Sequence, residues 1–141
     1  MKKLSALLLA LSTYLAADAQ TDSTAFRAYL YNKEYDVFLN INLYDQNISV
    51  PGQELYGQLP GYLSKKRNPF CWLITSSRLV SPTEAQLSLI NDYGSEDLTA
   101  RLTRDNDSTY TLRQLNGSTL KVPKDGKWQK LPKTLELKRR K

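Results

Sequence analysis

The segment from Leu98 to Val122, LTARLTRDNDSTYTLRQLNGSTLKV, decides the expected fold of this chain. Apolar residues alternate with polar ones on either side of two turn sequences, Asp105-Asn106-Asp107 and Leu115-Asn116-Gly117. Alternation with a period of two is typical of a strand that buries one face, and Asn-Gly is a frequent hairpin turn. The segment therefore predicts three antiparallel strands joined by two short turns.

The lengths of the two turns set which residues face each other. A two-residue loop at Asn116-Gly117 would place apolar Leu112 opposite charged Lys121. We expect three-residue loops instead, because register is fixed wherever one face of a sheet must be buried. They create the apolar rows Ala100–Leu112–Leu120 and Leu102–Tyr110–Val122. The opposite face then carries Arg101–Thr111–Lys121 and Thr99–Arg113–Thr119.

The rest of the chain is also dominated by short alternating segments, two of which are ambiguous. Residues 21–33 suit a first strand or a short capped helix, and their aromatic residues favour the strand. Residues 83–91 follow the capping-box sequence Ser81-Pro82-Thr83-Glu84, yet their own alternation favours a strand. The last segment, Trp128 to Leu137, is interrupted by Pro132 and suits an edge strand. Lys138 to Lys141 is expected to be a solvated basic tail.

This organisation predicts a single all-β domain of about 8–10 short antiparallel strands. Curled sheets, sandwiches and up-and-down barrels all share such a pattern. Phe70 to Thr75 is apolar on both faces, and Gly57 and Gly61 are positions where a sheet can bend. These features favour a curled sheet or up-and-down barrel, with Trp72 and Trp128 in its core.

The N-terminal residues have the form of a secretory signal peptide. Lys2 and Lys3 precede an apolar run from Leu4 to Ala17, and Ala17-Asp18-Ala19 matches an A-x-A cleavage site. The run is shorter than the roughly 20 apolar residues of a membrane-spanning helix. We expect residues 1–19 to be removed and residues 20–141 to form one domain. The mature protein would be periplasmic or extracellular, in the manner of small bacterial envelope proteins.

Composition restricts the chemistry that the chain can perform. There is no histidine, which removes the commonest general base and the usual transition-metal ligand. Cys71 is the single cysteine, so neither an intrachain disulfide nor an ordinary zinc site can form. Its apolar neighbours predict a buried side chain rather than a reactive thiol. No phosphate-binding or dinucleotide motif is present. We expect no cofactor, no metal and no enzymatic activity.

Acidic residues leave two alternatives open. A pair of carboxylates could support glycoside hydrolysis, but spacing selects no pair among Glu54, Glu84, Asp92, Glu96 and Asp97. The segments Asp92–Asp97 and Asp105–Asp107 could bind calcium, although neither has EF-hand spacing. Aspartate and asparagine are also the usual turn formers. Carboxylates in turns are therefore the simpler interpretation.

Aromatic and basic residues are the remaining candidates for function. Three of the nine tyrosines lie beside glycines in expected loops or strand ends, where aromatic side chains can contact glycan, peptide or protein. The net charge of +6 favours anionic partners. The candidate binding residues are Tyr56, Tyr62, Tyr93, Glu96, Asp97, Arg101, Arg113 and Lys121.

The resulting hypothesis is an exported, non-catalytic protein that binds a protein, a glycan or a small apolar ligand. One alternative is an enzyme inhibitor or immunity-type protein, acting through a protruding loop such as Ser64–Pro69 or Tyr93–Asp97. A carboxylate-dependent hydrolase is the third. An open apolar cavity would favour a ligand, whereas a filled core with exposed loop aromatics would favour a protein partner. Export argues against nucleic acid as the partner.

Overall fold

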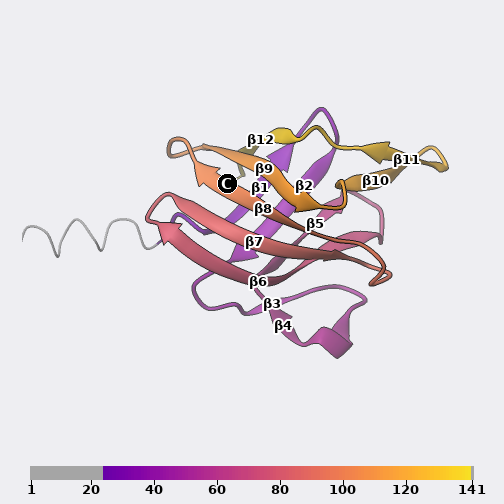
Figure 1. Ribbon diagram of the computed structural model, residues 1–141, viewed down its shortest axis with the longest axis horizontal. Helices are drawn as coiled ribbons and strands as arrows, with labels where there is room; N and C mark the ends of the chain where they lie inside the picture. Colours follow the sequence, from indigo (N-terminus) through magenta and orange to yellow (C-terminus); the bar gives the residue numbers. More distant parts are fainter. Residues whose placement is uncertain (1–23, 141) are drawn as a thin grey trace, which may run out of the picture.

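The computed structural model describes residues 24–140, and these form an eight-stranded antiparallel barrel with two small accessory sheets (Figure 1). The expected signal peptide, residues 1–19, lies outside the described residues. A 3-10 turn, η1 (Glu54–Tyr56), separates two short strands. The strands in chain order are β1 (Arg27–Asn32), β2 (Val37–Asn42), β3 (Ile48–Ser49), β4 (Gln58–Leu59), β5 (Gly61–Lys65), β6 (Cys71–Ser81), β7 (Glu84–Asn91), β8 (Asp97–Arg104), β9 (Thr109–Gly117), β10 (Lys121–Lys124), β11 (Lys127–Lys130) and β12 (Thr134–Arg139).

The barrel strands follow the order β1-β12-β9-β8-β7-β6-β5-β2, and β2 returns to β1 to close the circle. Where the first and last strands meet, Leu30 lies opposite Arg139 and Tyr31 opposite Lys138. The prediction of an all-β antiparallel barrel is thus confirmed. Closure leaves the barrel without an edge. The segment predicted as one edge strand is two strands: β12 has a partner on each side, so the edge prediction is wrong there, whereas β11 pairs only with β10. The expected solvated tail is corrected too, because Lys138 and Arg139 end β12.

The barrel interior is filled by side chains. Alternate residues of every strand point inward and pack with neighbouring segments into one apolar cluster. Its largest fully buried members include Trp72, Tyr110, Phe26, Leu30, Leu39, Ile41, Leu63, Ile74, Leu87, Leu89 and Leu102. Eight strands give an interior of about the width that side chains can fill. The inward face is therefore a hydrophobic core.

An aromatic side chain ties a covering segment to each end of the barrel. At one end, the Tyr110 hydroxyl donates to the carbonyl oxygen of Ala25 and accepts from Arg139 at 2.7 Å. At the other end, the Trp72 indole donates to the carbonyl oxygen of Lys121 at 2.9 Å. Both rings are fully buried, so these bonds satisfy polar atoms that water cannot reach. Leu120, Val122 and Leu131 complete the second cover.

The predicted register between β8 and β9 is wrong by two residues. Leu102 faces Leu112 and Ala100 faces Gln114, whereas Ala100 was expected opposite Leu112. The turn is longer than three residues, because the Asn106 side chain accepts hydrogen bonds from the Ser108 and Thr109 amides, both at 3.0 Å. A two-residue slip keeps the same side chains on the same face. The predicted buried residues of β8 and β9 are therefore correct, although their predicted pairing is not.

The predicted third strand of that sheet is also wrong. Leu120 and Val122 are buried as expected, but they belong to the cover and not to the barrel wall. The neighbour of β9 is β12, whose Leu135 and Leu137 face Leu112 and Tyr110. β10 pairs only with β11. The reason is that β12 must lie beside β9 to close the barrel, and its leucines supply the same apolar face.

Both ambiguous segments are strands. Residues 27–32 form β1, which confirms the expected first strand. β7 buries Ala85, Leu87 and Leu89 in the core, so pairing with β6 and β8 overrides the capping-box sequence before it. The prediction that Trp128 lies in the core is wrong, because this residue is on a hairpin outside the barrel and its side chain is 48% exposed.

Candidate functional site

Four aromatic rings gather at the end of the barrel where residues 66–70, residues 92–96 and the β10–β11 hairpin meet; we call this the loop end. The Phe70 ring lies at the centre, with its centroid 4.9 Å from that of Trp128, 5.8 Å from Tyr93 and 6.3 Å from Trp72. Phe70 and Trp72 are buried, whereas Tyr93 is 73% and Trp128 48% exposed. The aromatic cluster, Phe70, Trp72, Tyr93 and Trp128, is thus a buried base with two exposed rings.

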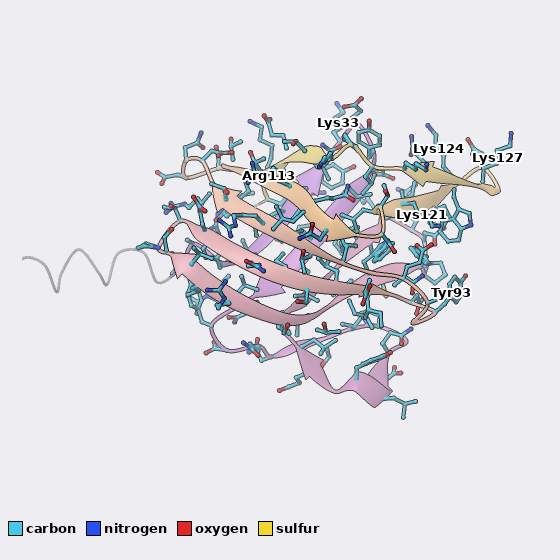
Figure 2. The ribbon with its side chains drawn as sticks, in the orientation of Figure 1. Lys33, Tyr93, Arg113, Lys121, Lys124 and Lys127 are labelled. Carbon is cyan, nitrogen blue, oxygen red and sulfur yellow. The ribbon has the colours of Figure 1, made fainter. Side chains whose placement is uncertain are left out.

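The turn between β7 and β8 is built to project Tyr93. The buried side chain of Asn91 accepts hydrogen bonds from the amides of Ser95 at 2.9 Å and Glu96 at 3.2 Å. Gly94 has φ +72°, a left-handed conformation that glycine adopts without steric cost. Because Asn91 fixes the turn from within, Tyr93 stands outside it while the backbone stays anchored. Figure 2 shows Tyr93 at the same end of the barrel as Lys121.

The β10–β11 hairpin presents the second exposed ring. Its turn residues Asp125 and Gly126 have φ +53° and +77°, as a two-residue turn of type I′ requires. Trp128 lies opposite Pro123, and Lys121 lies opposite Lys130 on the same face. The Lys121 ammonium is 5.6 Å from the centre of the Trp128 ring and 2.9 Å from a carboxylate oxygen of Glu96. Lys121 therefore links the hairpin to the β7–β8 turn.

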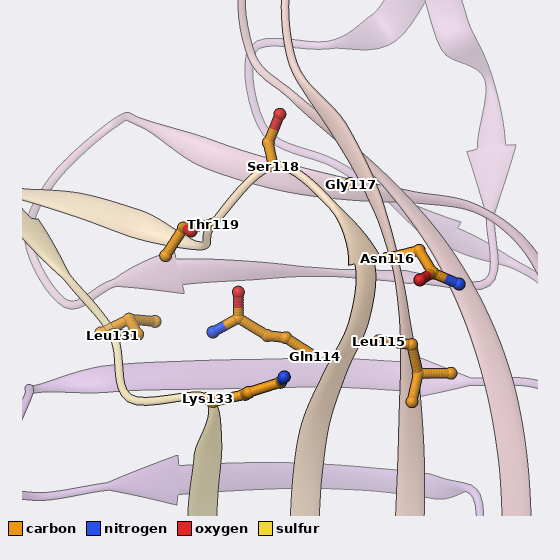
Figure 3. A pocket seen from close by; sticks show the side chains of 8 residues that line it. All are labelled: Gln114, Leu115, Asn116, Gly117, Ser118, Thr119, Leu131 and Lys133. Carbon is orange, nitrogen blue, oxygen red and sulfur yellow. The ribbon is translucent and has the colours of Figure 1, made fainter.

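One buried amide, Gln114 at 8% exposure, clamps the base of this hairpin. Its side chain accepts a hydrogen bond from the Leu120 amide at 2.8 Å and donates to the Pro132 carbonyl at 3.1 Å. Figure 3 shows Gln114 pointing toward Leu131 and Lys133 in a hollow of about 240 Å³. Because the oxygen and the nitrogen of the Gln114 side chain are both bonded to the backbone on either side of the hairpin, we assign this hollow a structural role.

The hairpin is strongly basic. Within ten residues it carries Lys121, Lys124, Lys127 and Lys130 against a single acid, Asp125. The last three lysines are exposed, and none of them forms an ion pair within residues 24–140. Figure 1 shows the hairpin projecting beyond the barrel, and Figure 2 shows Lys124 and Lys127 on its outer part. The exposed rings thus lie beside uncompensated positive charge.

The residues predicted for binding fall into separate regions. Tyr93, Glu96 and Lys121 meet at the loop end, where the exposed Asp97 begins β8. Arg101 and Arg113 face each other on the outer surface of the barrel, where Arg101 pairs with Glu84 at 3.2 Å. The predicted row Arg101–Thr111–Lys121 is therefore wrong, because Arg113 and not Thr111 lies opposite Arg101. Tyr62 lies on the outer surface of β5, and Tyr56 belongs to η1.

Phe70 and Trp128 were not predicted as site residues. Large apolar side chains are usually buried, so Trp128 was assigned to the core. The available signal was its setting, an Asp-Gly turn between lysines, which is typical of an exposed hairpin. Phe70 carries no such signal, because its role depends on which loops the barrel brings together.

The acidic loops have identifiable structural partners. Asp105 accepts from the Thr111 hydroxyl at 2.6 Å, and Asp107 pairs with Arg104 at 2.6 Å. Asp92 accepts a hydrogen bond from the Gln53 side chain. Among residues 24–140 no three of the residue types Cys, Asp and Glu come close enough to hold a metal ion. In the same range, no helix has the length and apolar character to cross a lipid bilayer.

Cys71 is buried beneath residues 43–60, the flap, whose Val50 and Leu59 pack against Cys71 and Leu73. Burial raises the pKa of the Cys71 thiol to about 11, with a further contribution from the negative charge of Asp92. The thiol is therefore neutral at physiological pH and lacks the thiolate needed for nucleophilic chemistry.

Comparison with known proteins supplies no relative. No family model, curated protein or solved structure matches this chain. Functional inference therefore rests on the exposed aromatic rings and basic hairpin of the loop end.

Proposed function

We propose that this protein is an exported, non-catalytic binding protein that engages an acidic partner protein through the loop end. The observation that carries the proposal is the exposure of Tyr93 and Trp128 on a rigid base. Tyrosine and tryptophan are enriched among residues that dominate protein–protein binding energy. Both rings contact Phe70, which reduces the side-chain freedom that remains to be lost when a partner binds.

The filled interior supports a partner on the outside of the barrel. Eight-stranded barrels that bind a ligand internally leave room for it between the strands. Here Trp72 closes the loop end from within and Tyr110 closes the other end. A macromolecular surface that lies across the loop end fits this arrangement better than a ligand that enters the barrel.

The charge of the hairpin indicates the chemistry of the partner. Lys124, Lys127 and Lys130 are exposed and have no ion-pair partner in the described part of the chain. Uncompensated charges of one sign attract a surface of the opposite sign and speed association, and salt screens the attraction. We infer an acidic partner whose affinity falls as ionic strength rises.

A non-catalytic role is supported by the ion pairs that the candidate carboxylates form. Glu84 and Glu96, two of the acids considered for hydrolysis, pair with Arg101 at 3.2 Å and Lys121 at 2.9 Å. Paired carboxylates that hold strands and turns together are poor candidates for an acid–base pair. If the acidic partner is itself an enzyme, this protein would act as an enzyme inhibitor or immunity-type protein.

Export rests on the sequence of residues 1–19. N-terminal sequencing of protein recovered outside the cytoplasm should start at Gln20. An intact Met1 on the exported protein would contradict a cleaved signal peptide.

The binding proposal is tested by affinity capture from envelope extract, using residues 20–141 as bait, followed by a titration with the captured protein. The double variant Y93A/W128A should lose the partner. Y56A is the matched control, because Tyr56 is also an exposed aromatic, at 44%, but lies on η1. Thermal unfolding of each variant should show that the barrel stays folded. Equal affinity of Y93A/W128A and wild type, or an affinity independent of salt, would refute the proposal.

A further inference from the structure

The outer face of β1, β2 and β5 carries an unusual row of aromatic side chains. Tyr29 and Phe38 stack with ring centroids 5.1 Å apart and planes 13° apart. Tyr62 meets Phe38 edge-on at 5.6 Å and 81°. The outward face of an antiparallel sheet is normally polar, yet these three rings are half-buried against each other. This part of the barrel wall therefore has an apolar outer surface.

The flap and the β5–β6 loop turn this surface into a groove of about 390 Å³. Phe38 and Tyr62 line it, with Pro51 of the flap and Pro69 of the β5–β6 loop. The flap is held down by Val50 and Leu59, which are buried against β6. The volume of the groove lies within the roughly 300–1,000 Å³ range of small-molecule sites, and such sites typically have apolar walls.

Two cations, Lys65 and Arg67, are the charged residues that line the groove. Neither forms an ion pair with any residue in the range 24–140. No acidic side chain lines the groove among the described residues; Asp36 accepts a hydrogen bond from Tyr31, and Asp92 accepts one from Gln53. The groove therefore combines apolar walls with two cations that form no ion pair among the described residues.

The loop that carries Arg67 has a defined shape. Arg67 has φ +63°, and the flanking amides donate to the carbonyl oxygens of Asp36 at 2.9 Å and Lys65 at 3.2 Å. The Asn68 side chain accepts from the Phe70 amide at 2.9 Å. Cys71, which also lines the groove, carries no charge to oppose an anion, because burial raises its pKa to about 11. These contacts fix the backbone that carries Lys65 and Arg67 before any ligand binds.

We propose that this groove binds a small aromatic acid, with its ring against Phe38 and Tyr62 and its acid group at Lys65 and Arg67. Apolar contact supplies affinity, and the two cations select for an anion over a neutral molecule of the same shape. The groove shares residues 67–69 with the loop end, but neither Tyr93 nor Trp128 lines it. Binding here needs no partner protein and goes beyond the function proposed for the loop end.

Two probes of the same ring system test the proposal, 1-naphthoate and the neutral 1-naphthalenemethanol. Naphthoate should bind with one-to-one stoichiometry and shift amide resonances of residues 62–69 in nuclear magnetic resonance spectra. The alcohol should bind about tenfold more weakly, because a hydrogen bond to a charged group contributes roughly 1.5–3 kcal/mol and the rim is partly solvated. Equal affinities for the two probes would overturn the role of Lys65 and Arg67.

Three variants locate the site. R67N removes the charge but keeps a residue that tolerates a left-handed backbone, and it should weaken naphthoate binding about tenfold. R113Q removes a distant exposed arginine and should bind as wild type does. Y93A/W128A should also bind naphthoate normally, which separates this groove from the exposed rings of the loop end. Loss of binding in Y93A/W128A, or equal loss in R67N and R113Q, would refute the proposal.

Discussion

Replacement of Gln114 by leucine should release the β10–β11 hairpin from the barrel. Gln114 holds the chain where it leaves β9 and where it returns to β12, through the Leu120 amide and the Pro132 carbonyl. Leucine has a similar size and keeps the apolar contacts of the side-chain stem. The substitution therefore removes the two hydrogen bonds while it disturbs packing little.

The expected cost follows from the burial of the two backbone groups. A buried polar group left without a partner costs about 1–3 kcal/mol. Leu120 is 1% exposed, so its amide would lose its partner without gaining water. Pro132 is half-exposed, and water can replace the amide at its carbonyl oxygen. We expect Q114L to lower the free energy of unfolding by about 2–3 kcal/mol.

Chemical denaturation and amide hydrogen exchange measure this effect. Q129L is the matched control, because Gln129 lies in the same hairpin and its side chain makes no hydrogen bond among the described residues. Q129L should change stability by less than about 0.5 kcal/mol. In Q114L the Leu120 and Leu131 amides should exchange faster than those of β7 and β8. The clamp role is refuted if Q114L matches Q129L in stability, or if exchange accelerates uniformly over the barrel.

Two further predictions concern the barrel wall and the flap. G61A should destabilise by about 3 kcal/mol, since a Cβ there would collide with the Asn40 carbonyl and approach Ile41 Cγ2 to 2.8 Å; G94A meets open space and should cost about 1–2 kcal/mol for its φ of +72° alone. Equal denaturation midpoints for the two would contradict this. The raised pKa of Cys71 means that the unfolded chain loses its thiol proton first. The stability advantage of wild type over C71A should therefore fall by about 2 kcal/mol between pH 9 and 11, and a constant difference would contradict the cause.

Sequence pattern was sufficient to predict which residues the barrel buries. Alternation in β7 and β8 identified the inward faces, because a strand has only two faces and one of them must be apolar. It was insufficient for pairing, because a shift of two residues leaves each face unchanged. Alternation also could not identify the strand that lies beside β9. Leu120 and Leu135 both offer an apolar face to Leu112, and only closure of the whole barrel selects β12.

The candidate sites were partly predictable. A glycine beside a tyrosine indicated Tyr93 and Tyr62. Gly94 has φ +72° and permits the turn that leaves the Tyr93 ring outside, whereas Tyr62 faces outward through the alternation of β5. Trp128 was missed, because residue type alone predicts burial for so large an apolar side chain. The groove beside Tyr62 was beyond prediction, because its walls come from residues 51, 38 and 69, which only the folded flap brings together.

The seam between β1 and β12 has a consequence for the order of assembly. The strands that close the barrel stand at opposite ends of the described chain, and Asn32 donates to the Glu136 carbonyl at 2.8 Å across that seam. The hairpins from β6 to β9 join near neighbours in sequence and can form early, whereas closure must wait for the last strand. Until then β9 and β1 are open edges. A crowded solution of folding chains would let β12 of one copy complete the barrel of another, giving a swapped dimer with the same strand pairings.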